Sequence, residues 1–153
     1  MALSIATLAY LVRDYDEAIA FFTQKLGFRL LEDSPISPTK RWVRVAPAPA
    51  SKSNSKSKPA PGATLLLARA ANARQRAQVG KQGGGRVWLF LQTSRFWADY
   101  RRMKSAGVEF TEEPRDEPYG WVVVFTDLYG NRWDLVEAPK KRRKPGTIQR
   151  QPL

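Results

Sequence analysis

The side chain best suited to chemistry in this sequence is Asp134, which lies in the stretch 127–137. A glycine and an asparagine at 130–131 tolerate a positive φ angle and predict a tight turn. Residues 133–137 then alternate in polarity, which predicts a strand with one buried face. A carboxylate beside an apolar surface can have a raised pKa, bind a cation or abstract a proton. The alternative is a structural acid that is solvated or paired with Arg132.

The chain of 153 residues contains no histidine and no cysteine. This excludes a histidine base, a Ser-His-Asp triad, an imidazole-bound metal and a thiol nucleophile, and leaves Asp, Glu, Tyr and Lys for acid–base work. The sequence also lacks an apolar run of about 18 residues and a charged leader, so we expect no membrane span and no signal peptide. Together these features predict a cytoplasmic protein.

The net charge of +12 is high enough to suggest a nucleic-acid partner. Much of it, however, lies in two segments rich in Lys and poor in apolar residues, the loop 47–62 and the tail 140–153. We expect both segments to be disordered and the folded part to be only mildly basic. Nucleic acid is therefore an unlikely partner, although a basic accessory protein that binds nucleic acid through its tail stays an alternative.

The first half of the chain predicts one helix among four strands. Asp14 and Glu17 form a capping box, the apolar residues that follow recur at helical spacing, and Gly27 ends the helix. The loop 47–62 precedes the last of these strands, and a short helix over 70–78 follows it. The predicted strands cover residues 3–12, 28–33, 41–45 and 63–69.

The second half repeats this order after a break at the three glycines 83–85. Its helix has an apolar face of Phe96, Tyr100 and Met103 and ends at Gly107. Its strands are predicted at 87–92, 108–112, 121–126 and 133–137. The order strand–helix–strand–strand–strand thus occurs twice, which predicts an α+β fold built by internal duplication.

One helix covers only one face of a sheet, so each half leaves its other face open. By strand alternation the face opposite the helices gathers polar groups among apolar neighbours: Thr7, Trp88, Gln92, Arg132 and Asp134. Such a surface is typical of a small-molecule pocket. The alternative is an ordinary core in which these groups pair with one another.

The chain resembles the vicinal oxygen chelate superfamily of glyoxalases, extradiol dioxygenases and bleomycin-resistance proteins. The resemblance rests on residues 12–22, 26–28 and 103–108 and on Asp127-x-x-Gly-Asn-x-x-Asp-Leu, in this paired order. It implies two βαβββ modules, about 3–70 and 86–138, that form a curved, barrel-like mixed sheet with the helices outside. It also implies a single domain over 1–139 and a homodimer.

Members of this superfamily that use a divalent metal take its ligands from the concave faces of both modules. Those positions fall on Thr7, Leu66, Trp88 and Asp134, of which only Asp134 keeps a strong ligand. Even with Gln92 nearby, such a set suits at best a loosely held hard cation. We therefore expect no metal and no cofactor, with a metal-dependent lyase or dioxygenase as the alternative.

The bleomycin-resistance type implies a protein that sequesters a small organic ligand without a metal. Four aromatic residues could stack on a planar ligand, namely Trp42, Trp88, Phe90 and Tyr119. Asp134 could receive a cation, and Arg44 or Arg132 could receive an anion. A metal-free enzyme in which Asp134 abstracts a proton is a further alternative, so the sequence leaves catalysis open.

Overall fold

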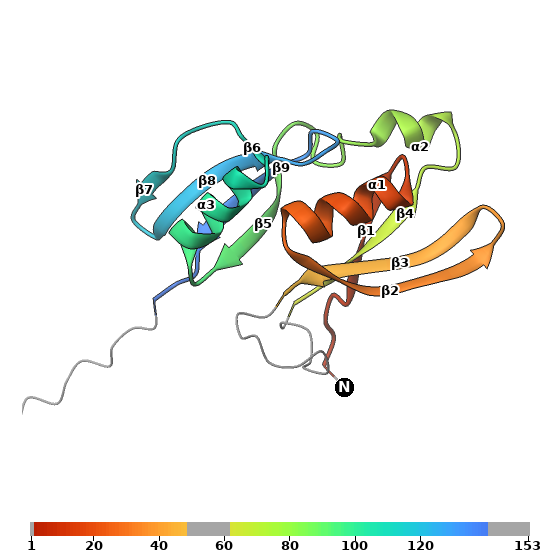
Figure 1. Ribbon diagram of the computed structural model, residues 1–153, viewed down its shortest axis with the longest axis horizontal. Coiled ribbons are helices and arrows are strands. Elements are labelled where there is room, and N and C mark those ends of the chain that lie inside the picture. Colours follow the sequence, from red (N-terminus) through yellow and green to blue (C-terminus); the bar gives the residue numbers. More distant parts are fainter. Residues whose placement is uncertain (1, 49–61, 141–153) are drawn as a thin grey trace, which may run out of the picture.

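The computed structural model describes residues 2–48 and 62–140, so most of the loop 47–62 and of the basic tail lies outside the described residues. Module 1, the red-to-yellow part of Figure 1, forms a four-stranded sheet, here called sheet A. Its elements are β1 (Thr7–Val12), α1 (Tyr15–Ala20), η1 (Phe21–Lys25), β2 (Phe28–Ser37), β3 (Lys40–Pro47) and β4 (Thr64–Arg69). The short helix α2 (Ala73–Gln78) follows.

Module 2, the green-to-blue part of Figure 1, forms sheet B. Its elements are β5 (Val87–Thr93), α3 (Phe96–Ser105), β6 (Glu109–Phe110), β7 (Arg115–Glu117), β8 (Gly120–Thr126) and β9 (Arg132–Glu137). The strand orders β1-β4-β3-β2 and β5-β9-β8-β6 are equivalent, with the first strand parallel to its neighbour in each sheet. This confirms the predicted α+β class and the repeated plan, but the two sheets do not close into a barrel.

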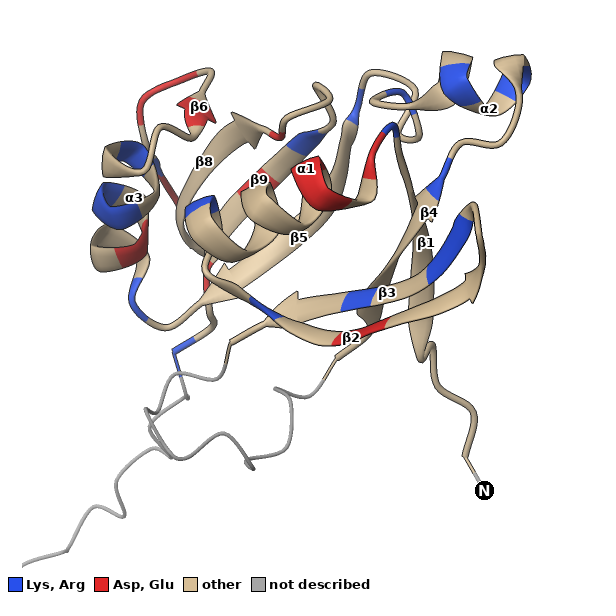
Figure 2. Cartoon of the chain, turned by 45° about the vertical axis from the view of Figure 1, so that its right-hand side comes forward, with Lys and Arg blue, Asp and Glu red and all other residues tan. Residues whose placement is uncertain are grey.

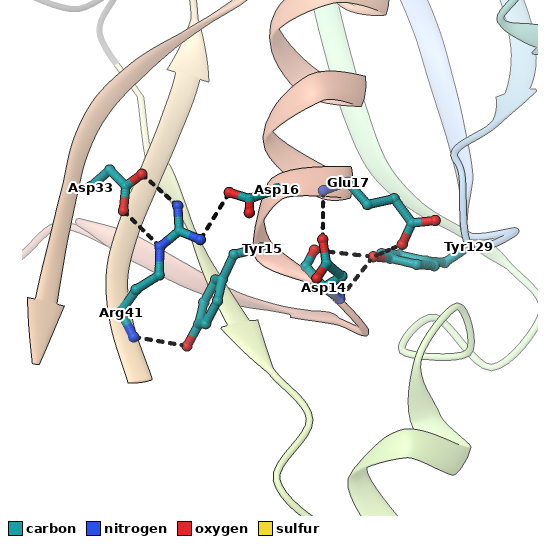
Figure 3. A network of polar contacts seen from close by, with 7 residues as sticks. All are labelled: Asp14, Tyr15, Asp16, Glu17, Asp33, Arg41 and Tyr129. Carbon is teal, nitrogen blue, oxygen red and sulfur yellow. Dashed lines mark hydrogen bonds and ion pairs between the residues drawn. The ribbon is translucent and has the colours of Figure 1, made fainter. Parts of the chain in front are cut away.

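The first helix begins as the capping box predicts and then departs from it. The backbone N–H of Glu17 donates to Asp14 Oδ1 at 2.8 Å, so Asp14 is the N-cap. The Glu17 carboxylate does not turn back to complete the box. It accepts a hydrogen bond of 2.9 Å from the Tyr129 hydroxyl in module 2 (Figure 3). Glu17, which we expected to stabilise its own helix, therefore makes a hydrogen bond to module 2 instead.

The helix continues as one π-helical turn, in which the N–H of Leu26 donates to the carbonyl of Phe21. Its apolar face is buried as predicted, with Phe22 fully inaccessible and Leu26 only 3% exposed. Gly27 follows with φ of 73°, a left-handed conformation that glycine adopts without steric cost. The chain can therefore turn sharply into β2.

The helix-covered sides of the two sheets meet in one shared core. The Phe22 ring of η1 packs edge-on against Tyr10 of sheet A, with ring centroids 5.1 Å apart, and lies 6.1 Å from Trp133 of sheet B. Trp88 stacks on Tyr10 at 5.7 Å. Since these contacts join the covered sides, the opposite faces of the two sheets are turned away from each other.

A buried carboxylate, Asp127, links the modules at the centre of this core. The Tyr10 hydroxyl and the Trp133 indole N–H both donate to its Oδ2, at 2.6 and 2.9 Å. The Asn131 side chain also donates to Oδ2, and the backbone N–H groups of Tyr129 and Asn131 donate to Oδ1. Burial, followed by the negative charge of Asp127, raises the pKa of Tyr10 well above its usual range. The phenol therefore stays protonated as a donor.

No helix in the described part of the chain is long and apolar enough to cross a membrane.

Replacing Asp127 by Ala should destabilise the fold severely. The substitution leaves the Tyr10 hydroxyl, the Trp133 indole and the Asn131 amide buried without their shared acceptor. An expected loss of about 3–5 kcal/mol in the free energy of unfolding follows from several unpaired buried donors. Urea denaturation monitored by circular dichroism measures it.

The matched control is Asp116→Ala, because Asp116 is exposed on β7. Its effect should stay within about 0.5 kcal/mol, as for most surface substitutions. Equal stabilities of the two variants would contradict the role assigned to Asp127.

Candidate functional site

The face of sheet B that is turned away from α3, here called the open face of sheet B, holds four of the predicted site residues. Trp133 and Leu135 of β9 point into the core, so strand alternation puts Asp134 on the other side. Phe90 of β5 is the neighbour of Asp134 across the parallel ladder. The open face of sheet B thus comprises Phe90, Gln92, Arg132 and Asp134.

Phe90 is an apolar side chain left in solvent on this face. It is 68% exposed, although its strand neighbours Leu89 and Leu91 pack against the core. Exposure of a whole aromatic ring next to a carboxylate is unusual for a structural position. The pair Phe90 and Asp134 therefore offers a stacking surface beside an acceptor.

The Asp134 carboxylate lies partly buried and incompletely paired. Its Oδ1 is inaccessible and has no hydrogen-bond partner among the described residues. Burial raises its pKa above the ordinary value; Arg115 and Arg132 oppose that shift and Glu112 adds to it. Because Asp134 as a whole is only half-buried, its unpaired carboxylate can gain a hydrogen bond or an ion pair from a ligand at the surface.

The neighbours of Asp134 come from a segment that sequence patterns do not resolve. The second strand of module 2 is interrupted between β6 and β7, and Glu112 lies in the gap. Its Oε1 accepts from the backbone N–H of Val124 and from Arg115 Nε, both at 3.1 Å, and Arg115 also pairs with Glu117. In the sequence these neighbours are marked only by the polar stretch 112–120, which does not show which of its charged residues lie next to Asp134.

Three other predicted residues lie on the open face of sheet A. Arg44 is paired across the strands with Leu66 and Glu32, and its Nε lies 3.2 Å from Glu32 Oε2. Trp42, two residues away on β3, is 39% exposed. The Thr7 hydroxyl lies 3.0 Å from that of Thr64. Arg44 and Thr7 thus already have partners, whereas Trp42 offers an accessible ring.

The structure places Trp88 on the opposite face of sheet B from the one that strand alternation predicts. The β5–β9 ladder is irregular between Val87 and Leu89, and Trp88 falls at that point. Its ring turns to the covered side, where it stacks on Tyr10 and packs against the core. Trp88 is therefore not on the open face that the sequence predicted for it.

Tyr119 and Arg132 lie at the margins of sheet B. Tyr119 is in the turn between β7 and β8 and is 59% exposed. Arg132 is exposed and its Nη1 lies 3.4 Å from the carbonyl of Gly85. The predicted residues are thus divided between two open faces, a turn and the core, and do not line one cleft within the chain.

The residues at the metal-ligand positions of the superfamily do not form a transition-metal site. Leu66 has no donor atom, Trp88 lies in the core and the Thr7 hydroxyl adjoins that of Thr64. Within the described residues no three His, Cys, Asp or Glu side chains gather where they could hold a metal. One carboxylate with a nearby amide falls short of the three or four ligands that such ions require.

The family model described as the glyoxalase/bleomycin resistance protein/dioxygenase superfamily matches residues 4–135. An uncharacterised protein from Shewanella frigidimarina is 47% identical over 143 residues, which cover 93% of this chain and 98% of that protein. The crystal structure of UcmS2 has a TM-score of 0.72 at 29% identity and covers 90% of this chain and 100% of its own.

TnmS3, an antibiotic binding protein from Streptomyces sp. CB03234, has a TM-score of 0.65 at 28% identity. The similarity covers 92% of this chain and 99% of TnmS3. The family model matches most of the sequence, and the structure has the repeated βαβββ topology. The chain therefore belongs to the glyoxalase/bleomycin resistance protein/dioxygenase superfamily.

Proposed function

We propose that this chain is a cytoplasmic, metal-independent binding protein for a small organic ligand, and that it works as a homodimer. The ligand lies on the open face of sheet B, where its planar part stacks on Phe90 and a cationic or hydrogen-bond-donating group meets Asp134. The observation that carries the proposal is the exposed Phe90 ring beside the half-buried Asp134 carboxylate, whose Oδ1 has no partner among the described residues.

The charges around Asp134 favour a donor group on the ligand. Arg115, the first of the cations near Asp134, is already shared between Glu112 and Glu117. Asp134 keeps an oxygen without a partner in the described structure. A ligand amine or N–H would pair with the accessible part of this half-buried carboxylate, and the adjacent aromatic ring would hold the planar part by stacking.

The proposed dimer supplies the enclosure that one chain lacks. Small-molecule sites bury most of their ligand, whereas the open face of sheet B is a single exposed surface. A second copy could cover it with its own sheet A, whose open face carries the accessible Trp42.

The antibiotic-binding activity named for TnmS3 supports a binding role for this chain. TnmS3 and the present chain share the fold across almost their whole lengths. A separate observation disfavours the metal-dependent lyase or dioxygenase alternative. Two of the metal-ligand positions hold Leu66, which has no donor atom, and Trp88, which packs against the core.

Binding of proflavine, a planar aromatic cation, should depend on both residues of the proposed site. Asp134→Asn should weaken proflavine about tenfold, the usual loss for one charge-assisted hydrogen bond. Phe90→Ala should weaken it about threefold to tenfold through lost stacking. Fluorescence titration gives the dissociation constants.

Asp116→Asn is the matched control, because this exposed acid on β7 should leave the affinity unchanged. Anthracene carboxylate, a planar anion, should bind more weakly than proflavine. Equal affinity of the wild type and the Asp134→Asn variant for proflavine would refute the proposed site.

Metal analysis of the purified protein should find less than about 0.1 equivalent of tightly held transition metal, because one carboxylate cannot hold such an ion against water. Elemental analysis by mass spectrometry after dialysis without a chelator makes the measurement. A stoichiometric transition metal would contradict metal independence.

Asp134→Asn should also raise stability at neutral pH. Because burial raises the pKa of Asp134, the folded state binds this proton more tightly than the unfolded state. Its stabilising contribution is present at low pH and is lost as the pH rises through the folded pKa. Urea denaturation at several pH values should show the advantage of the variant shrinking on acidification; an advantage that grows would contradict this.

A further inference from the structure

A cavity lies on the covered side of sheet B, whereas the proposed ligand site is on the open face of that sheet. Its volume is about 460 Å³, within the range of small-molecule pockets. It is bounded by the end of β5, the first turns of α3 and the corner where η1 passes into β2. Gln92, near the end of β5, is the predicted site residue that borders it.

The floor of this cavity is apolar and built by both modules. Phe28 comes from module 1, and Met103 and Leu135 come from module 2. All three are buried in the shared core, with Met103 fully inaccessible. The accessible apolar surface at this seam comes from two half-buried side chains, Pro47 of module 1 and Leu91 of module 2, and a hydrocarbon group placed here would cover them.

The rim of the cavity has one positive charge in excess. Asp99 accepts a hydrogen bond from the Thr93 hydroxyl and lies 3.5 Å from Arg102 Nε. Arg102 also donates to the carbonyls of residues 25 and 26, at the end of η1. The two opposite charges therefore offset each other within the fold.

Arg95 is the remaining charge on the rim. Its guanidinium makes no ion pair or side-chain hydrogen bond among the residues that the structure describes. Lys and Arg residues gather along α3, as Figure 2 shows, so the local potential favours an anion. The positive end of α3 has the same sign and lies beside Arg95.

We propose that this cavity binds an amphipathic monocarboxylate, with its hydrocarbon part against Pro47 and Leu91, above the buried Met103, and its carboxylate paired with Arg95. A chain of roughly eight carbons suits a pocket of this size. Gln92 is the one residue that this site shares with the open face of sheet B as defined above, and the site needs no second copy of the protein.

Methionine provides a specific probe of the cavity, because the chain has only two methionines, Met1 and Met103. Protein labelled with ¹³C in the methionine methyl groups is titrated with octanoate and followed by NMR. The Met103 methyl signal should shift and saturate. Octyltrimethylammonium, which has the same chain and the opposite charge, should produce no saturable shift.

Arg95→Gln should weaken octanoate about tenfold, the loss expected for one charge-assisted pair. Arg101→Gln is the matched control on the same helix, because Arg101 is exposed and its guanidinium lies 5.9 Å from the centre of the Trp97 ring. It should leave octanoate binding unchanged. Circular dichroism should show that both variants stay folded, since both arginines are exposed.

Phe90→Ala separates this proposal from the function proposed above. It should reduce proflavine binding and leave octanoate binding intact, whereas Arg95→Gln should do the reverse. An unshifted Met103 signal, an equal response to octyltrimethylammonium, or wild-type affinity in the Arg95→Gln variant would each overturn the carboxylate site.

Discussion

The fold depends on a buried carboxylate, Asp127, that takes hydrogen bonds from both modules. Tyr10 of β1 supplies a phenol from one side. From the other side, Trp133 of β9 supplies an indole, and the turn before β9 supplies an amide and two backbone N–H groups. A buried charge is tolerated only when its oxygens are fully bonded. The relative position of the two sheets, and hence of their open faces, follows from this contact.

Local sequence features predicted the elements well, because each depends on residues close in the chain. Asp14 caps its helix, and Gly27 and Gly107 adopt positive φ. The second strand of each module, β2 or β6, differs from its predicted range mainly in length. The importance of Asp127 was missed for the opposite reason. Its partner Tyr10 is 117 residues away, and no local pattern distinguishes a buried turn acid from a solvated one.

The candidate site was predicted in part. Alternation put Asp134 and Phe90 on the open face, where the structure has them, because β9 is regular beside a buried Trp133. Alternation failed at Trp88, where one irregular ladder step turns the ring inward. Neither Arg115 beside Asp134 nor the cavity below α3 could be foreseen, since both arise from tertiary packing.

The link through Asp127 makes the two repeated units unequal partners. The first unit contributes the phenol and the second contributes the acid, so two copies of either unit alone would lack half of the interaction. A repeat of this kind can no longer be reduced to a symmetric pair of identical half-length chains. The symmetry of the repeat survives in the strand order, while the hydrogen bonds at the centre require one unit of each kind.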